Sequence, residues 1–304
     1  MKNLTIIGFG NQAKAWALNL RDSGWQITIG LRPNSSSISL VKELNFEIST
    51  LDEIKENSVI AVLTPDDTHY EIVKHISQKI KKAKFIFAHG YSLLYTPIPK
   101  EFHTYEHILI APKAIASELR YQYETKGKNG GVYSFEYLQD KKEKKQYLEL
   151  AKDLGLTSLY EATISDETKA DLFSEQSILC STLPYAALYS FNELRKNGVS
   201  KEVAFFECWH EVKLIANTLI NVGPEKFFKL ISPNALIGSE IGHQCLFDQQ
   251  YMKKLSEIFQ SIDNGQFDEN LSKIDIDKTR NEITNFWKKQ ELTQVYNELK
   301  KDLY

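Results

Sequence analysis

The sequence predicts an α/β domain built on a parallel sheet, followed by a domain that is all α. Short β-branched runs alternate with amphipathic helical patterns over roughly the first 160 residues, and this alternation is typical of βαβ units. From Asp166 onward helical periods dominate. The 304 residues, 42% hydrophobic and 25% charged, are enough for two separate cores. We therefore predict domains at residues 1–163 and 164–304.

Short apolar runs predict the strands of the sheet, and the segments between them have helical periodicity. The predicted strands are residues 4–8, 26–30, 58–63, 84–88 and 107–111. One predicted helix, residues 12–22, stops just before Gly24, and another, residues 68–81, ends in a lysine-rich turn that suits the helix dipole. Strands joined through helices in this way lie parallel.

The second half of the chain contains long stretches of helical periodicity, such as residues 204–219 and 249–262. Its tail, residues 275–304, alternates charged residues with spaced apolar ones. This pattern predicts a packed amphipathic helix and not a disordered arm.

Charge and hydropathy argue against two classes of partner. The chain carries 37 basic and 40 acidic residues, a net charge of -3, so it has no excess positive potential for a nucleic-acid backbone. The apolar stretch at residues 178–191 is interrupted by polar residues and Pro184, which argues against a membrane span. The first residues run directly into a strand pattern without a signal core, so we expect a cytoplasmic protein.

A glycine-rich turn follows the first predicted strand and opens the first predicted helix. Gly8 permits a tight turn, and Gly10 allows a pyrophosphate to approach the helix N-terminus. This position is typical of a Rossmann-type dinucleotide site. The residues of the turn are Gly8, Phe9, Gly10, Asn11, Gln12 and Ala13.

The turn after the second predicted strand indicates which dinucleotide is bound. An NAD site usually has an acid here for the ribose 2′-hydroxyl, but this chain has none before Glu43. Instead Arg32 supplies a cation, and Ser35, Ser36 and Ser37 supply hydroxyl donors, a set that suits a 2′-phosphate. The pattern favours NADPH; the alternative is a polar surface turn without a ligand.

Two pairs of acids, Asp171/Glu175 and Glu207/Glu211, have four-residue spacing and so lie on one face of a helix. Both occur in apolar surroundings, and buried carboxylates require partners. Carboxylate oxygens suit Mg²⁺, so two such helices would hold a pair of ions. Salt bridges to nearby lysines are the open alternative.

Taken together, these stretches resemble ketol-acid reductoisomerase in its short form with a single knotted helical domain. The resemblance runs from Gly8 to about Glu240. The stretches that carry it are residues 17–24, Gly30-Leu-Arg-Pro33, Thr64-Pro-Asp-Asp67, Ala88-His-Gly90, Ala111-Pro-Lys113, Asp171-Leu-Phe-Ser-Glu-Gln176 and residues 206–215.

The resemblance implies roles for further residues. Asp171 and Glu175 would bind metal from one helix, and Glu207 and Glu211 from another, contributed by the second subunit of a homodimer that shares its active site. By the same resemblance, His89 and Lys113 would lie beside the nicotinamide and Glu211 would take part in proton movement. The implied contacts to cofactor and substrate involve Thr64, Pro65, Ile231 and Ser232.

The implied reaction needs NADPH, two Mg²⁺ ions and a small 2-keto or 2-hydroxy acid. Alkyl migration in a substrate of the 2-acetolactate type would precede reduction to a 2,3-dihydroxy acid, as in isoleucine and valine biosynthesis. The sequence departs from the family at residues 114–119, where a bulkier loop replaces a glycine-rich one, and at residues 233–237. Two alternatives remain open: a reductase of a different 2-keto acid, and a non-catalytic dinucleotide-binding protein.

Overall fold

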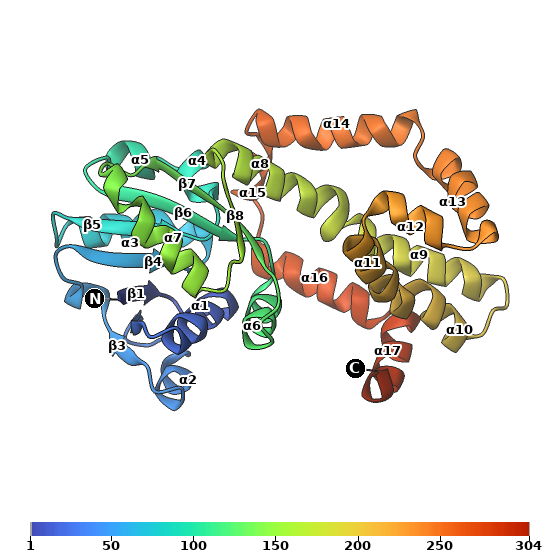
Figure 1. The fold of residues 1–304 in the computed structure, drawn as a ribbon, viewed down its shortest axis with the longest axis horizontal. Coiled ribbons are helices and arrows are strands. Elements are labelled where there is room, and N and C mark those ends of the chain that lie inside the picture. Colours follow the sequence, from blue (N-terminus) through green and yellow to red (C-terminus); the bar gives the residue numbers. More distant parts are fainter. Residues whose placement is uncertain (1, 304) are drawn as a thin grey trace. The chain divides into compact units, whose positions relative to one another are not determined.

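The computed structural model describes residues 2–303, which form two compact units with a boundary between Ala170 and Asp171. We call residues up to 170 the α/β unit and residues from 171 the helical unit; Figure 1 colours the first blue to green and the second yellow-green to red. Among the described residues, none of the helices is both long and apolar enough to cross a bilayer.

One eight-stranded sheet forms the centre of the α/β unit, in the order β3-β2-β1-β4-β5-β6-β7-β8. The strands are β1 (Asn3–Ile7), β2 (Gln26–Gly30), β3 (Glu47–Ser49), β4 (Ser58–Val62), β5 (Ala83–Phe87), β6 (Glu106–Pro112), β7 (Gly130–Tyr137) and β8 (Ser158–Glu161). The order reverses between β1 and β4, as in doubly wound dinucleotide-binding folds. The predicted α/β class is confirmed.

The neighbouring strands from β3 to β6 pair in parallel, but β7 runs antiparallel to β6. The sequence did not predict β3, β7 or β8. β3 has only three residues, β7 begins with two glycines, and three of the four residues of β8 are exposed, so none of them gives a clear apolar run. The five predicted strands pair in parallel as expected, and β7 adds an antiparallel strand that the sequence did not predict.

Helices cover both faces of the sheet because successive strand side chains point to opposite sides. In β6, Ile108 and Ile110 belong to the core cluster under α1, α6 and α7, whereas Leu109 belongs to the cluster under α3, α4 and α5. These helices are α1 (Asn11–Asp22), α2 (Ile38–Glu43), α3 (His69–Ser77), α4 (Tyr91–Tyr95), α5 (Ile98–Glu101), α6 (Ala116–Glu124) and α7 (Lys144–Asp153), with 3-10 turns η1 (Leu51–Glu53), η2 (Asp66–Thr68) and η3 (Lys141–Glu143).

Of the segment predicted as a bulkier loop, residues 114–119, only Ala114 and Ile115 are non-helical, and residues 116–119 begin the helix α6. Leu119 is completely buried, and Arg120 pairs with Glu124 one turn later at 2.7 Å. Burial of one face and a charge pair at four-residue spacing both favour a helix. The expectation of a loop is therefore wrong for residues 116–119.

The helical unit has a small core around Phe191, Phe205 and Val295. The predicted single tail helix is two helices, α16 and α17, and Tyr304 lies outside the described residues. Helix α8 (Ile164–Ser174) spans the unit boundary and runs into the π-helical turn η4 (Glu175–Leu179). The later helices are α9 (Thr182–Lys196), α10 (Lys201–Phe205), the π-helical turn η5 (Phe206–His210), α11 (Glu211–Val222), α12 (Pro224–Leu230), α13 (Pro233–Leu246), α14 (Gln249–Asp263), α15 (Gln266–Leu271), α16 (Ile276–Lys288) and α17 (Glu291–Leu303).

Candidate active site

The turn between β1 and α1 has the backbone that a dinucleotide site requires. Gly8 has φ +92°, and a Cβ atom there would lie 2.8 Å from Thr64 Cγ2, so a larger residue would clash and be strained. Gly10 caps α1 without a side-chain hydrogen bond, and the first turn of α1 has no acid. The first amides of this helix are thus available to an anion.

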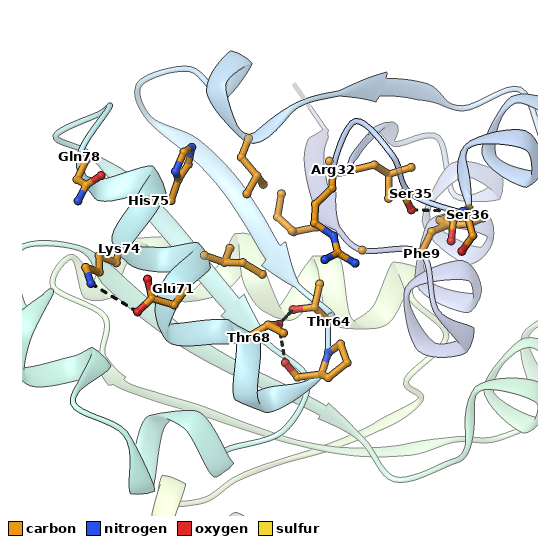
Figure 2. A pocket seen from close by; sticks show the side chains of 18 residues that line it. Phe9, Arg32, Ser35, Ser36, Thr64, Thr68, Glu71, Lys74, His75 and Gln78 are labelled. Carbon is orange, nitrogen blue, oxygen red and sulfur yellow. Dashed lines mark hydrogen bonds and ion pairs between the residues drawn. The ribbon is translucent and has the colours of Figure 1, made fainter. Parts of the chain in front are cut away.

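A cavity of about 620 Å³ lies beside this turn, at the carboxyl ends of β1, β2 and β4. Figure 2 looks into it: Arg32 points inward from the turn after β2, Glu71, Lys74 and His75 line it from α3, and Gln78 lines it just after this helix. Of the ten predicted cofactor residues, seven line this cavity: Gly8, Phe9, Arg32, Ser35, Ser37, Thr64 and Pro65. Gly10, Asn11 and Gln12 do not line it but form the start of α1.

The turn from Arg32 to Ser37 is built by its own hydrogen bonds. The Ser35 amide donates to the Arg32 carbonyl oxygen at 3.0 Å, and the Ser37 amide donates to Ser35 Oγ at 3.3 Å. This turn contributes a guanidinium and hydroxyl groups to the cavity and no carboxylate. The one acid lining the cavity, Glu71, comes from α3 and lies 3.5 Å from Lys74. The arrangement suits a phosphate on the Arg32 side.

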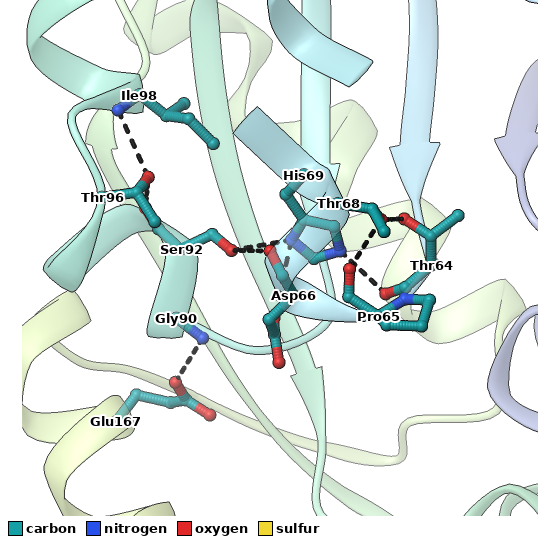
Figure 3. Close-up of polar contacts among 10 residues, drawn as sticks. All are labelled: Thr64, Pro65, Asp66, Thr68, His69, Gly90, Ser92, Thr96, Ile98 and Glu167. Carbon is teal, nitrogen blue, oxygen red and sulfur yellow. Dashed lines mark hydrogen bonds and ion pairs between the residues drawn. The ribbon is translucent and has the colours of Figure 1, made fainter. Parts of the chain in front are cut away.

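A buried carboxylate that was not predicted from the sequence holds Lys113 in place. Lys113 Nζ donates to Glu167 Oε1 at 2.6 Å, and the side chain of Glu167 is 1% exposed. Glu167 Oε2 also accepts a hydrogen bond from the Gly90 amide at 2.9 Å (Figure 3). One side chain therefore connects the turns after β5 and β6.

Gly90 permits this close approach. A Cβ atom at position 90 would lie 2.8 Å from Glu167 Oε2 and 2.3 Å from Thr168 Oγ1. His89 precedes it, and one of its ring nitrogens lies within 4.8 Å of a Glu167 carboxylate oxygen. The structure thus brings His89 and Lys113, both predicted from the sequence, around the same carboxylate.

Glu167 had a signal in the sequence. It precedes Asp171 by four residues, as Asp171 precedes Glu175, so three acids share one helix face. The charged stretch from Asp166 to Lys169 is also typical of a solvated surface. Only tertiary packing distinguishes the buried Glu167 from its charged neighbours Asp166 and Lys169, which are more exposed.

Both predicted carboxylate pairs lie at π-helical turns. Asp171 is on α8 and Glu175 begins η4; Glu207 is in η5 and Glu211 begins α11. Such turns are rare and occur frequently at functional sites. The sequence pattern predicted regular helices here and gave no sign of this irregularity.

The carboxylate pairs are less buried in a single chain than their apolar neighbours led us to expect. Asp171 is partly buried, whereas Glu175, Glu207 and Glu211 are exposed. Some of the surrounding apolar residues are exposed as well, for example Phe206 at 40% and Ile215 at 43%, although Leu172 and Phe205 are buried. The expectation of burial is wrong for one chain because these helix faces are left uncovered.

The two predicted substrate residues lie at the start of α13. Ser232 is its N-cap, with Oγ accepting a hydrogen bond from the Ala235 amide at 3.2 Å, and Ile231 immediately precedes it. Ser232 is exposed and Ile231 is partly exposed. The cap accounts for a serine at this position without a ligand, so the substrate role stays a prediction.

Comparison with known proteins covers both halves of the chain. Residues 1–159 match the family model for the acetohydroxy acid isomeroreductase NADPH-binding domain, and residues 164–303 match that for the ketol-acid reductoisomerase C-terminal domain. The ketol-acid reductoisomerase (NADP(+)) of Campylobacter hominis is 34% identical over 273 residues, 88% of this chain and 79% of the relative. That of Helicobacter pylori strain 26695 is 36% identical, covering 86% and 81%.

A solved structure agrees with these matches. It is an NADH-preferring ketol-acid reductoisomerase from an uncultured archean, 28% identical, with a TM-score of 0.86 over 99% of this chain and 94% of the other. The resemblance that rested on ordered short motifs is therefore confirmed across both units. This chain belongs to the ketol-acid reductoisomerase family.

Proposed function

We propose that this enzyme converts a 2-acyl-2-hydroxy acid of the 2-acetolactate type into a 2,3-dihydroxy acid, using NADPH and two Mg²⁺ ions. The observation that carries the proposal is that one chain matches both family domains and keeps all four acids of the predicted metal set. The matches favour this activity over the two alternatives that the sequence left open, a reductase of another 2-keto acid and a non-catalytic protein.

The proposed cofactor is NADPH because the cavity side formed by the turn after β2 presents Arg32 and serine hydroxyls and no acid. The solved relative described above is NADH-preferring, so cofactor choice varies among similar enzymes. Arg32 is the residue on which we base the choice here, because a guanidinium binds phosphate with paired hydrogen bonds.

The proposed metal ligands are Asp171, Glu175, Glu207 and Glu211, whose oxygens are the type that Mg²⁺ prefers. When bound, two Mg²⁺ ions would polarise the carbonyl and hydroxyl oxygens of the substrate, and NADPH would supply the hydride. Within the chain, Glu167 fixes the Lys113 ammonium at the carboxyl end of β6. There Lys113 would bind negative charge on the substrate, and Glu211 is the proposed carrier of a proton.

We propose a homodimer whose subunits share the active site. The exposed apolar faces of the helical unit support it, since Ile237 is 61% exposed, Ile241 65% and Leu230 65%. Uncovered apolar faces of this extent are unusual in a monomer and mark interaction surfaces. The carboxylates that are exposed in one chain would gain cover in such an assembly.

The test of the activity is NADPH oxidation measured with 2-acetolactate and Mg²⁺. We expect turnover by the wild-type enzyme and none by Glu207→Gln, which keeps the size of the side chain but removes a charged ligand. Glu202→Gln is the matched control, because Glu202 is an exposed acid on the adjacent α10 that pairs with Lys201 at 3.9 Å. It should retain wild-type turnover.

A second substrate separates the two chemical steps. A 3-hydroxy-2-keto acid needs reduction but no alkyl migration. Turnover of both substrates supports the full reaction, whereas turnover of the keto acid alone would show that this enzyme lacks the migration step. NADPH binding without turnover of either acid would contradict the proposed activity.

A further inference from the structure

His69 is a buried histidine that none of the predicted roles uses. It begins α3, directly after the turn of residues 64–68 that we call the Thr64 turn, and it is 4% exposed. Its ring lies between this turn and the segment of residues 89–92, the His89 turn, which contains His89 and Gly90 (Figure 3). The two turns follow β4 and β5, which are neighbours in the sheet.

Both ring nitrogens of His69 have hydrogen-bond partners, one in each turn. Nε2 lies 2.9 Å from the Thr64 carbonyl oxygen, and Nδ1 lies 2.8 Å from Ser92 Oγ. A carbonyl oxygen only accepts, so Nε2 carries the proton. Nδ1 is then an acceptor, and the Ser92 hydroxyl donates to it. A neutral imidazole satisfies this arrangement completely.

The surroundings keep the ring neutral. Burial lowers the pKa of His69 below its usual value and outweighs the opposing effects of Asp66, of the hydrogen bond to Thr64 and of Asp67, while His89 lowers the pKa slightly further. The nearest charged atom is Asp66 Oδ1, 3.5 Å from Nδ1. The link through His69 therefore consists of two directed hydrogen bonds and not of an ion pair. Ser92 Oγ also lies 3.5 Å from the Asp66 carbonyl oxygen, a longer contact between the same two turns.

His69 links the two turns just beyond the last paired residues of β4 and β5. The pairing of β4 with β5 extends to Val62 and Phe87, and beyond this point the two turns share no ladder hydrogen bonds. Thr64 lines the nucleotide cavity and limits the residue at position 8, as described above. Ser92 follows Gly90, whose amide binds Glu167. His69 thus connects the wall of the cofactor cavity to the segment that holds His89.

We infer that His69 is a positioning residue of the reductase: it fixes the Thr64 turn to the His89 turn, so that the cofactor and the reacting groups keep a constant separation. The inference rests on the proposed cofactor cavity and on a role for the His89 turn in turnover. His69 touches neither substrate nor cofactor in this scheme and acts through the two turns.

The test compares three variants with the wild-type enzyme. His69→Leu removes both hydrogen bonds at similar volume, and His69→Gln keeps one donor and one acceptor. Ser92→Ala keeps the bond of His69 to Thr64 but removes the Ser92 hydroxyl, which bonds His69 and lies 3.5 Å from the Asp66 carbonyl oxygen. The measured quantities are the Kd for NADPH from fluorescence titration, kcat and KM with 2-acetolactate, and amide hydrogen exchange of residues 64–68 and 89–92.

We expect His69→Leu to raise the Kd for NADPH and lower kcat, each by about tenfold, because each lost bond leaves a buried partner unsatisfied. His69→Gln should restore both values to within about threefold. Ser92→Ala should lower kcat by about tenfold with the Kd for NADPH nearly unchanged. This split between kcat and Kd is not expected of a residue that only stabilises the fold.

His107→Leu is the matched control. His107 is also buried, at 1% exposed, and also bonds a carbonyl oxygen, that of Phe102 at 3.1 Å, but it lies near the amino end of β6. It should lower thermal stability without changing kcat or Kd. If His69→Leu behaves in the same way, with both turns exchanging as in the wild-type enzyme, the inference is wrong.

Hydrogen exchange separates failure of this inference from failure of the proposed function. If the wild-type enzyme binds NADPH but turns over no substrate, the proposed function fails, yet the linkage is still measured. Faster exchange in both turns of His69→Leu, restored by His69→Gln, supports the linkage. Faster exchange confined to α3 contradicts it, and so does a Ser92→Ala enzyme with wild-type kcat.

Discussion

The α/β unit and the helical unit bury their apolar side chains to different extents. Among the described residues, four large apolar side chains are exposed in the α/β unit and twenty-three in the helical unit. The α/β unit has a continuous core on each face of its sheet, whereas the core cluster of the helical unit comprises six buried residues among those described. We call the α/β unit closed because most of its large apolar side chains are buried within it. The helical unit instead leaves several amphipathic faces exposed in one chain.

This contrast separates what each unit can do by itself. The nucleotide cavity is lined entirely by residues of the α/β unit, so we expect cofactor binding not to depend on a second subunit. The predicted metal ligands instead lie on helices whose apolar neighbours face solvent in one chain. We therefore expect substitutions on the helical unit to affect assembly and turnover together, and substitutions in the α/β unit to affect binding or stability locally.

The largest expected effect comes from placing charges on the uncovered face of α13. Ile237 and Ile241 share one face of this helix, and both are exposed. If a second subunit covers them, Ile237→Asp with Ile241→Asp buries two unpaired charges, at a cost of several kcal/mol. We expect a monomer by light scattering, with turnover lost and NADPH binding retained.

The control for this prediction is a charge on the isolated exposed tyrosine of β8. Tyr160 is 71% exposed and belongs to the closed α/β unit. Tyr160→Asp should leave both mass and turnover unchanged. An α13 double variant that keeps the wild-type mass and turnover would show that the helical unit is not completed by another copy through this face.

The next largest effect concerns the buried pair of Lys113 and Glu167. Lys113→Met leaves the Glu167 carboxylate buried without its cation, which typically costs about 3–5 kcal/mol of the free energy of unfolding. Adding Glu167→Gln removes that charge and still offers an oxygen to the Gly90 amide, so stability should recover. Activity should stay at least about 100-fold below wild type in both, if Lys113 is catalytic.

The measurement is denaturant unfolding together with kcat. Lys84→Met is the matched control, since Lys84 forms a partly buried pair with Glu143 near the amino end of β5. It should destabilise less and leave kcat unchanged. A double variant with restored stability and restored activity would show that Lys113 has a structural role only.

The strands of the sheet show which parts of the fold could be predicted from the sequence. Strands β1, β2, β4, β5 and β6 are buried on both faces and give apolar runs, so their positions were predicted correctly. The strands that were not predicted are short, exposed or glycine-containing. The direction of β7 depends on its pairing with β6, which no local pattern records.

The candidate active site likewise contains some residues that could be predicted from the sequence and others that could not. The positions of Gly8 and Arg32 at the cavity were predictable because each lies at or just after the end of a predicted strand, at the carboxyl end of the sheet. The phosphate contact of Arg32 stays a prediction. The burial of Glu167 was not predictable, because it arises when α8 packs against the turn after β5, far away in sequence. The π-helical turns at Glu175 and Glu207 were not predictable either, since four-residue spacing describes a regular helix.

A smaller effect is expected at the cofactor cavity, within the closed unit. Arg32→Gln should raise the Kd for NADPH by about 10- to 100-fold, because a charge-assisted bond to the 2′-phosphate is lost, and leave the Kd for NADH nearly unchanged. Lys42→Gln, on the adjacent α2, controls for a general loss of positive charge. Equal effects on both cofactors would argue against a phosphate contact at Arg32.

The smallest expected effect is a dependence of stability on pH that originates in the closed unit. Burial lowers the pKa of His107 to about 4, although its bond to Phe102 opposes the shift. The unfolded chain takes up this proton as the pH falls through about 6.5, but the folded protein does not until about 4. The contribution of neutral, buried His107 to the free energy of unfolding is therefore complete above pH 6.5 and is lost between pH 6.5 and 4, by at most about 1.4 kcal/mol per pH unit.

His107→Phe tests this prediction, because it keeps the aromatic packing against Phe85 and removes the titrating group. Thermal unfolding measured over this range should show a shallower slope for the variant, whereas a parallel slope would place the acid sensitivity at other groups, including the buried His69.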